Sequence, residues 1–321
     1  MKIIAASFRP FVPVVAFIAL VATAAGPAQA KIVRTVEKSF PVQSGGTLKI
    51  VSQGGDIAIQ TGEGAEVIVV ARQNIRASTE AEADELLKRL TLTFEQQGNV
   101  VTVTSKYEAK LPGLHFGSWP PVLVDFVVTV PHDFNADLKT SGGDIAVGNL
   151  NGRVLARTSG GDVKLEKIDG TVDAGTSGGD IMLREGTAAV KLSTSGGDIQ
   201  IERATGPIEV STSGGDIAIS SADNLQRAAT SGGDITAMLT AAPKEDCSLH
   251  TSGGDVTVHL PKAAAFNLDA GTSGGKVDAA GLTITIEKGG VGRSRLSGKV
   301  NGGGAVLSLR SSGGDIEIRT D

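Results

Sequence analysis

Residues 176–201 read TSGGDIMLREGTAAVKLSTSGGDIQI, so the hexapeptide Thr-Ser-Gly-Gly-Asp-Ile occurs twice, eighteen residues apart. Further copies follow the same pattern. The first glycines of the copies are Gly142, Gly160, Gly178, Gly196, Gly214 and Gly232 at steps of eighteen, Gly253 and Gly274 at steps of twenty-one, and finally Gly313. A fixed period indicates a repeat architecture, in which each unit buries its apolar side chains against its neighbours. We assign the repeat region to residues 136–321.

Each repeat contains two short runs in which apolar and polar residues alternate. In one repeat the inward candidates are Ile181 and Leu183. After a turn, Val190 and Leu192 form the second run, and the next inward position falls on Thr194. Two strands and two turns per repeat predict an all-β fold, a parallel β-solenoid, whose roughly ten coils at about 4.8 Å each form a rod of about 48 Å. An antiparallel sandwich is the alternative, although it has no reason to keep a constant spacing.

Residues 31–135 do not follow the repeat and predict a β-rich N-terminal cap region. An early copy of the signature, Gln-Gly-Gly-Asp-Ile, occupies residues 53–57. We expect one helix, residues 78–90, because Thr79 and Glu82 match a capping box and an apolar stripe follows them.

The first thirty residues have the features of a secretory signal peptide. Lys2 and Arg9 precede an apolar stretch, residues 11–25, and Ala-Gln-Ala at residues 28–30 is a small-residue cleavage site. An uncleaved anchor is the alternative interpretation. We therefore expect an exported protein with no transmembrane segment after cleavage. The formal net charge of −5 does not favour nucleic acid or anionic lipid as a partner, and the single cysteine, Cys247, has no partner for an internal disulfide.

The aspartates of the signature form a column if the coils stack. They are Asp144, Asp162, Asp180, Asp198, Asp216, Asp234 and Asp255. We expect them to face outward and to accept hydrogen bonds from nearby backbone amides, with the two glycines at positive φ. A calcium site on these seven aspartates is the alternative, because aligned carboxylates are typical of calcium-binding β-rolls. Lys276 stands at the aspartate position of its own repeat, so we expect it to interrupt the column.

The threonines before the signature fall on inward positions and predict side-chain hydrogen-bond ladders rather than a binding face. The histidines are not spaced like metal ligands, and no nucleophile elbow or phosphate loop is present. We therefore predict no catalytic residue, no metal and no cofactor. A glycan-cleaving β-helix enzyme stays a minor alternative, since such enzymes work with acidic clusters.

Residues 107–121 form a proline-containing loop with a group of aromatic side chains. Tyr107, His115, Phe116 and Trp119 lie within it, and they are candidates for contact with a partner. The alternative is that they plug the N-terminal end of the solenoid, where an open ladder edge invites aggregation.

The repeated Thr-Ser-Gly-Gly-Asp-Ile, the run Val-Asp-Phe-Val-Val-Thr-Val-Pro at residues 124–131 and the ending at residues 298–318 resemble the bacterial "putative adhesin" family, domain of unknown function 4097. The resemblance covers nearly all of the chain after residue 30. It implies a β-solenoid exported or displayed at the bacterial envelope, here a periplasmic or secreted bacterial protein, and it implies no catalytic residue. We expect a non-enzymatic adhesin or scaffold, a monomer that presents its repetitive surface to a protein or glycan partner.

Overall fold

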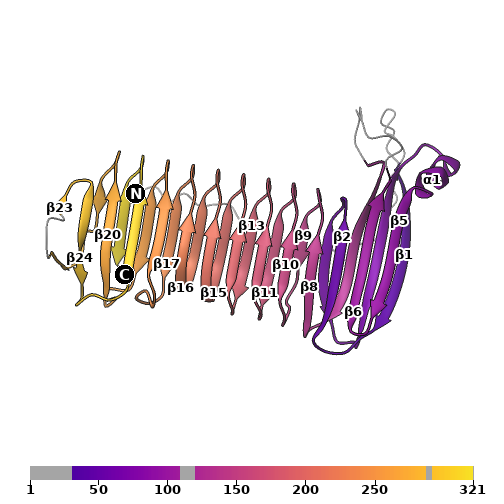
Figure 1. The fold of residues 1–321 in the computed structure, drawn as a ribbon, viewed down its shortest axis with the longest axis horizontal. Helices are drawn as coiled ribbons and strands as arrows, with labels where there is room; N and C mark the ends of the chain where they lie inside the picture. Colours follow the sequence, from indigo (N-terminus) through magenta and orange to yellow (C-terminus); the bar gives the residue numbers. More distant parts are fainter. Residues whose placement is uncertain (1–30, 109–119, 287–290, 321) are drawn as a thin grey trace, which may run out of the picture.

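The computed structural model describes residues 31–108, 120–286 and 291–320. Its strands stack side by side along one long axis, and Figure 1 shows the stack running from the indigo N-terminal part to the yellow C-terminal part. The predicted signal peptide, residues 1–30, lies outside the described residues, as do His115, Phe116 and Trp119.

Each coil contributes one strand to each of two parallel stacks. The first stack contains β8 (Phe134–Lys139), β10 (Val154–Arg157), β12 (Val172–Gly175), β14 (Val190–Ser193), the later halves of β15 (Ile199–Ser211) and β16 (Ile217–Ala229), and β18 (Cys247–Thr251). The second contains β9 (Ile145–Val147), β11 (Val163–Ile168), β13 (Ile181–Gly186), the earlier halves of β15 and β16, β17 (Ile235–Leu239) and β19 (Val256–Leu260).

The register of these stacks follows the sequence period. Val163 pairs with Ile181, and Ile181 pairs with Ile199, eighteen residues further on. In the other stack Val172 pairs with Val190. The predicted all-β parallel solenoid with coils of about eighteen residues is therefore confirmed, and the sandwich alternative is wrong.

Aliphatic side chains fill the space between the two stacks. Ile181, Leu183, Val190 and Leu192 are at most 2% exposed, so the alternation predicted for this coil is confirmed. A further inward column at the corner of the coils was not predicted. It contains Leu150, Ile168, Gly186, Ala204, Ala222 and Leu239. The residues in the middle of this column, Gly186, Ala204 and Ala222, are smaller than Leu150 and Ile168 before them and Leu239 after them.

The stack begins before residue 136, because residues 46–62 form a coil that pairs with β8 and β9. The remaining strands of this end are β1 (Lys31–Pro41), β4 (Glu66–Arg76), β5 (Leu90–Gln97), β6 (Val100–Tyr107) and β7 (Val122–Pro131). Two strands, β2 (Gly46–Ser52) and β3 (Ile57–Gly62), form a coil between β6/β7 on one side and β8/β9 on the other. Outside β6 and β7, β5 and β4 run antiparallel, and β1 closes the end against β4.

One helix, α1 (Glu80–Leu87), lies at this end of the stack (Figure 1). Thr79 is its N-cap: the Thr79 hydroxyl accepts the Glu82 amide at 3.2 Å, and the Glu82 carboxylate accepts the Ser78 amide at 2.8 Å. The predicted helix and its capping residue are confirmed, with a helix shorter than residues 78–90. Arg34 of β1 binds Glu80 and Asp84 of the helix, both at 2.7 Å.

At the C-terminal end, too, a coil lies between two coils that do not neighbour it in the sequence. Its strands are β20 (Phe266–Thr272), β21 (Val277–Asp278), β22 (Ile284–Thr285), β23 (Val291–Gly292), β24 (Arg295–Val300), β25 (Val306–Ser311) and β26 (Ile316–Thr320). The last coil, β25/β26, lies between β18/β19 and β20/β21. Beyond β20 lies the antiparallel strand β24, seen at the yellow end of Figure 1. The order of coils in space therefore differs from the order in sequence at both ends.

Candidate functional site

The aspartates of the signature form a hydrogen-bonded column along the stack. The Oδ1 atom of each carboxylate accepts the backbone amide of the residue at the same position in the next coil, at 2.6–3.1 Å. In spatial order the column runs Asp125, Asp56, Asp144, Asp162, Asp180, Asp198, Asp216, Asp234, Asp255, Asp315 and Lys276. The prediction that these aspartates accept backbone amides is confirmed, but the amides belong to the neighbouring coil rather than to the same turn.

Lys276 ends this column and does not interrupt it. The Lys276 amide donates to Asp315 Oδ1 at 2.9 Å. Asp315 belongs to the last coil, which lies between the coil of Asp255 and the coil of Lys276. The expectation of an interruption is wrong because it assumed that coils stack in sequence order. A carboxylate is needed only where another coil follows, and among the described residues no further coil of the signature follows Lys276.

The second glycine of each signature permits close contact between backbones. A Cβ at Gly161 would lie 2.2 Å from the Gly143 carbonyl oxygen, and one at Gly197 would lie 2.1 Å from that of Gly179. Among the described glycines of the signature, only Gly55 has a positive φ, of 93°. The expectation of positive φ throughout is therefore wrong. The constraint is the spacing of the coils, which leaves no room for a side chain.

The threonines form a second ladder beneath the glycines. The Thr158 hydroxyl donates to the Gly143 carbonyl at 2.8 Å and accepts the Gly161 amide at 3.4 Å. The residues that donate in the same way are Thr140, Thr176, Thr194, Thr212, Thr230, Thr251, Thr272 and Ser311. Since Thr158 is buried, the predicted structural role of this column is confirmed.

The hydrogen-bond role of the column predicts different effects for two substitutions of Asp198. Asp198→Ala removes the acceptor of the Asp216 amide, now 2.7 Å away, and we expect a loss of about 1–2 kcal/mol in the free energy of unfolding. Asp198→Asn keeps a carbonyl oxygen and relieves repulsion between neighbouring carboxylates, so its stability should match or exceed that of the wild type. Urea denaturation of both variants measures the difference, and an equal loss for both would contradict the ladder.

The calcium alternative predicts that the protein loses stability when calcium is removed. Within residues 31–108, 120–286 and 291–320, no three His, Cys, Asp or Glu side chains gather as metal ligands do. A calcium site held at a hundred times its Kd adds about 2.7 kcal/mol to stability. We expect the same melting temperature with calcium and with a chelator, and a higher one with calcium would support the calcium-organised rod instead.

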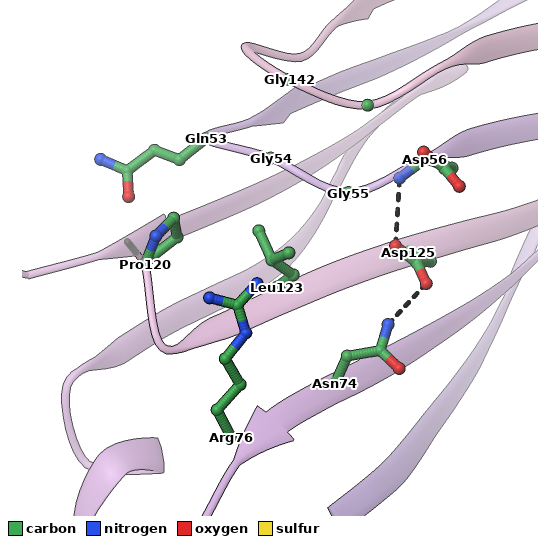
Figure 2. A pocket seen from close by; sticks show the side chains of 11 residues that line it. Gln53, Gly54, Gly55, Asp56, Asn74, Arg76, Pro120, Leu123, Asp125 and Gly142 are labelled. Carbon is green, nitrogen blue, oxygen red and sulfur yellow. Dashed lines mark hydrogen bonds between the residues drawn. The ribbon is translucent and has the colours of Figure 1, made fainter. Parts of the chain in front are cut away.

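A pocket of about 640 Å³ opens where the N-terminal cap region meets the repeats. Its lining residues are Gln53, Gly54, Gly55, Asp56, Asn74, Arg76, Pro120, Leu123, Asp125, Gly142 and Gly143. Figure 2 shows the Asp125 carboxylate between its two partners: Oδ1 accepts the Asp56 amide at 3.1 Å, and Oδ2 accepts the Asn74 side-chain amide at 2.5 Å. The first aspartate of the column therefore forms part of the pocket wall.

Both polar and apolar side chains face this pocket. Arg76, Leu123 and Pro120 are among the lining residues labelled in Figure 2. A guanidinium, a carboxylate and an amide beside an aliphatic surface can hold a small polar group such as a sugar or a partner's side chain. Sequence analysis missed Asn74, Arg76 and Asp125 because they belong to β4 and β7, outside the repeat. The early signature copy at residues 53–57 was the available signal.

Tyr107, a candidate partner contact, is buried. Only 3% of the residue is exposed, and it packs in one cluster with Ile75, Ala83 and Val122. The Arg89 guanidinium lies 5.1 Å from the centre of the ring, and burial raises the pKa of Tyr107. Tyr107 therefore belongs to the packing beneath α1. The contact role of the other three aromatic residues stays a prediction, because they lie outside the described residues.

Cys247 begins β18 and points into the core, where it is 1% exposed. Burial raises the pKa of its thiol to about 12, so almost no reactive thiolate exists near neutral pH. We expect the folded protein to resist a thiol reagent at pH 8 and to react stoichiometrically once unfolded in urea. Fast labelling without urea would show that the neighbouring coil opens readily.

In the described parts of the chain, no helix has the length and apolar character needed to cross a membrane.

The solved structures to which this chain is similar have low sequence identity to it, and no curated protein matches the chain. A "putative adhesin" from Bacteroides fragilis NCTC 9343 is 13% identical, with 90% of this chain and 97% of that chain covered and a TM-score of 0.37. Those from Parabacteroides distasonis ATCC 8503 and Parabacteroides merdae ATCC 43184 are both 12% identical, with 89% of this chain covered, 97% and 96% of theirs, and TM-scores of 0.48 and 0.38.

The family profile of Toastrack DUF4097 matches residues 46–319. This range begins with β2, the first strand of the inserted N-terminal coil, and ends within β26, in the inserted C-terminal coil. The resemblance stated from the repeated signature is thereby confirmed, and the chain belongs to the Toastrack DUF4097 family.

Proposed function

We propose that this protein is a non-enzymatic, exported component of the bacterial envelope that presents the outer faces of its coils to a protein or glycan partner. The observation that carries the proposal is the parallel pairing of each coil with the next from β8 to β19, with local register shifts where β15, β16 and β17 meet. Because each coil repeats the one before it, the outward side chains form straight rows on a body with a continuous core. Such rows can bind an extended partner at several points at once.

The chemistry of the coils supports a binding role. The signature's aspartate Oδ1 atoms and threonine hydroxyls already hold backbone groups, so these columns maintain the rod. The outward rows carry a varied set instead: Lys164, Met182, Gln200, Ala218 and Thr236 succeed one another along one face. The pocket where the N-terminal cap region meets the repeats, called the junction pocket below, adds a concave site near one end of the rod.

Export and partner binding are tested separately. For export, cell fractionation should place the protein outside the cytoplasm, and N-terminal sequencing of the mature protein should begin at Lys31. For binding, the mature chain is immobilised and exposed to envelope extracts and a glycan array, with an unrelated β protein of similar charge as control. Enrichment of a defined protein or glycan over that control is expected. Recovery of the full precursor in the cytoplasm, or binding no greater than the control, would oppose the proposal.

A further inference from the structure

The last coil, β25/β26, joins the C-terminal cap to the repeats. Among the described strands, β20 pairs only with β24 and β25, and β21 pairs only with β26. Neither pairs with β18 or β19, whose outer edges are instead occupied by the last coil. The last coil therefore fills a slot whose two walls come from earlier parts of the chain.

The last coil contacts the slot through buried apolar side chains and through backbone hydrogen bonds to both walls. Leu307, Leu309, Ile316 and Ile318 are at most 1% exposed. On one wall the Val256 amide donates to the Asp315 carbonyl at 2.9 Å, and on the other the Ile316 amide donates to the Lys276 carbonyl at 2.9 Å. These contacts depend on the sequence of the coil and not on how the coil is connected to the walls.

The connection into the slot is short and conformationally unusual. Asn301, Gly302 and Gly303 have φ values of 49°, 95° and 85°, and they link β24 to β25 across the end of β20. The Asn301 side-chain amide donates to the carbonyls of Lys262 and Ala264 at 3.0 and 2.9 Å. Three consecutive left-handed residues form a tight reversal, and glycine adopts the extended alternatives as easily.

We propose that the coil formed by residues 306–320 exchanges between two copies of this chain, with residues 301–304 as the hinge. A second copy offers an identical slot, so the exchanged coil regains every contact of the closed monomer and only the hinge changes. Exchange of an identical element is a low-cost route to a dimer when a hinge can open. The partner at this surface is therefore a second copy, and the resting form is the closed monomer.

The experiment places one cysteine on a wall of the slot in one molecule and one cysteine on the last coil in another molecule. Ser248 of β18 and Ser308 of β25 are directly paired, half-buried and outside the core. In a Cys247→Ser background, one mature protein carries Ser248→Cys and the other carries Ser308→Cys. The two are mixed, taken through a series of urea concentrations that ends in full unfolding, returned to buffer and oxidised. The disulfide between the two variants forms only where the coil of one copy lies in the slot of the other.

We expect a disulfide-linked heterodimer on a non-reducing gel, absent from a mixture oxidised without urea. While monomers dominate, mass action should raise its amount about fourfold for each doubling of protein concentration. The double variant Ser248→Cys/Ser308→Cys, oxidised before the urea series, has its coil locked in place and should yield no exchange. Heterodimer no more abundant than like-with-like dimers at every urea concentration would overturn the proposal.

A hinge variant gives an independent result. Deleting Gly302 and Gly303 removes two of the three left-handed residues of this reversal, so we expect the chain to cross β20 less readily and the coil to enter the slot of another copy instead. Size-exclusion chromatography should then show a dimer even in dilute solution. A monomer that melts like the wild type would contradict the assignment of the hinge, and if this variant does not fold, the cysteine pair still decides the proposal.

Discussion

Ending the chain after Gly304 is expected to unfold the whole C-terminal cap and not only to remove one coil. The truncation loses the burial of Leu307, Leu309, Ile316 and Ile318, which at roughly 1.5–3 kcal/mol each amounts to about 6–12 kcal/mol. It also removes the pairing partners that attach β20 and β21 to the rod. A loss of this size is comparable to the entire stability of many domains, about 5–15 kcal/mol.

A deletion of similar length inside the repeats is the matched control. Removing residues 178–195 deletes one period and rejoins Ser177 to Gly196, so the signature is restored. The coil with β11 and β12 then stacks on the coil with β15, and each end keeps its inserted coil. We expect this shorter rod to fold cooperatively in circular dichroism and urea denaturation, while the truncated chain loses its C-terminal strands and aggregates. Greater damage from the interior deletion would contradict the account of the last coil.

Gly161→Ala should be among the most damaging single substitutions in the chain. Its Cβ would lie 2.2 Å from the Gly143 carbonyl oxygen and 2.4 Å from the carbonyl carbon. Both are backbone atoms, so relief requires two coils to separate and their hydrogen bonds to lengthen. Overpacking usually costs about 1–3 kcal/mol, and we expect about 3 kcal/mol or more at this site because no side chain can move aside.

Gly160→Ala is the control, one residue away in the same turn. Its nearest neighbour would be the Gly142 Cα at 3.8 Å, an ordinary contact. Its effect on the midpoint of urea denaturation should therefore be small. Equal destabilisation by the two substitutions would mean that glycine is required for backbone conformation and not for the close approach of coils.

The repeat period predicted the middle of this molecule well. Ile181 lies beside Ile199 because both follow the same signature, and the local pattern of one coil is sufficient to place the next. The aspartate and threonine ladders follow from the same stacking. Even the helix was predicted, because Thr79 and Glu82 form a local capping interaction.

The ends could not be predicted, because the signature is the same in every coil and does not record which coil lies beside which. Gly313 lies next to both Gly253 and Gly274, although the sequence order places Gly274 between the other two. The choice depends on pairings between strands far apart in the sequence, such as β18 with β25 and β20 with β24. The junction pocket was missed for the same reason, since Asn74 and Asp125 come together only after β4 and β7 have paired.

The stacking itself can be measured by disulfide trapping between coils. Met182 and Gln200 are register partners on neighbouring coils with outward side chains, while Ala218 lies one coil further on. In a Cys247→Ser background, Met182→Cys with Gln200→Cys should form an intramolecular disulfide under mild oxidation, because paired Cα atoms fall within the roughly 4.4–6.8 Å that a disulfide spans. Met182→Cys with Ala218→Cys should stay reduced, since two coils of about 4.8 Å separate them. A disulfide in the second pair and none in the first would contradict the solenoid on which this account depends.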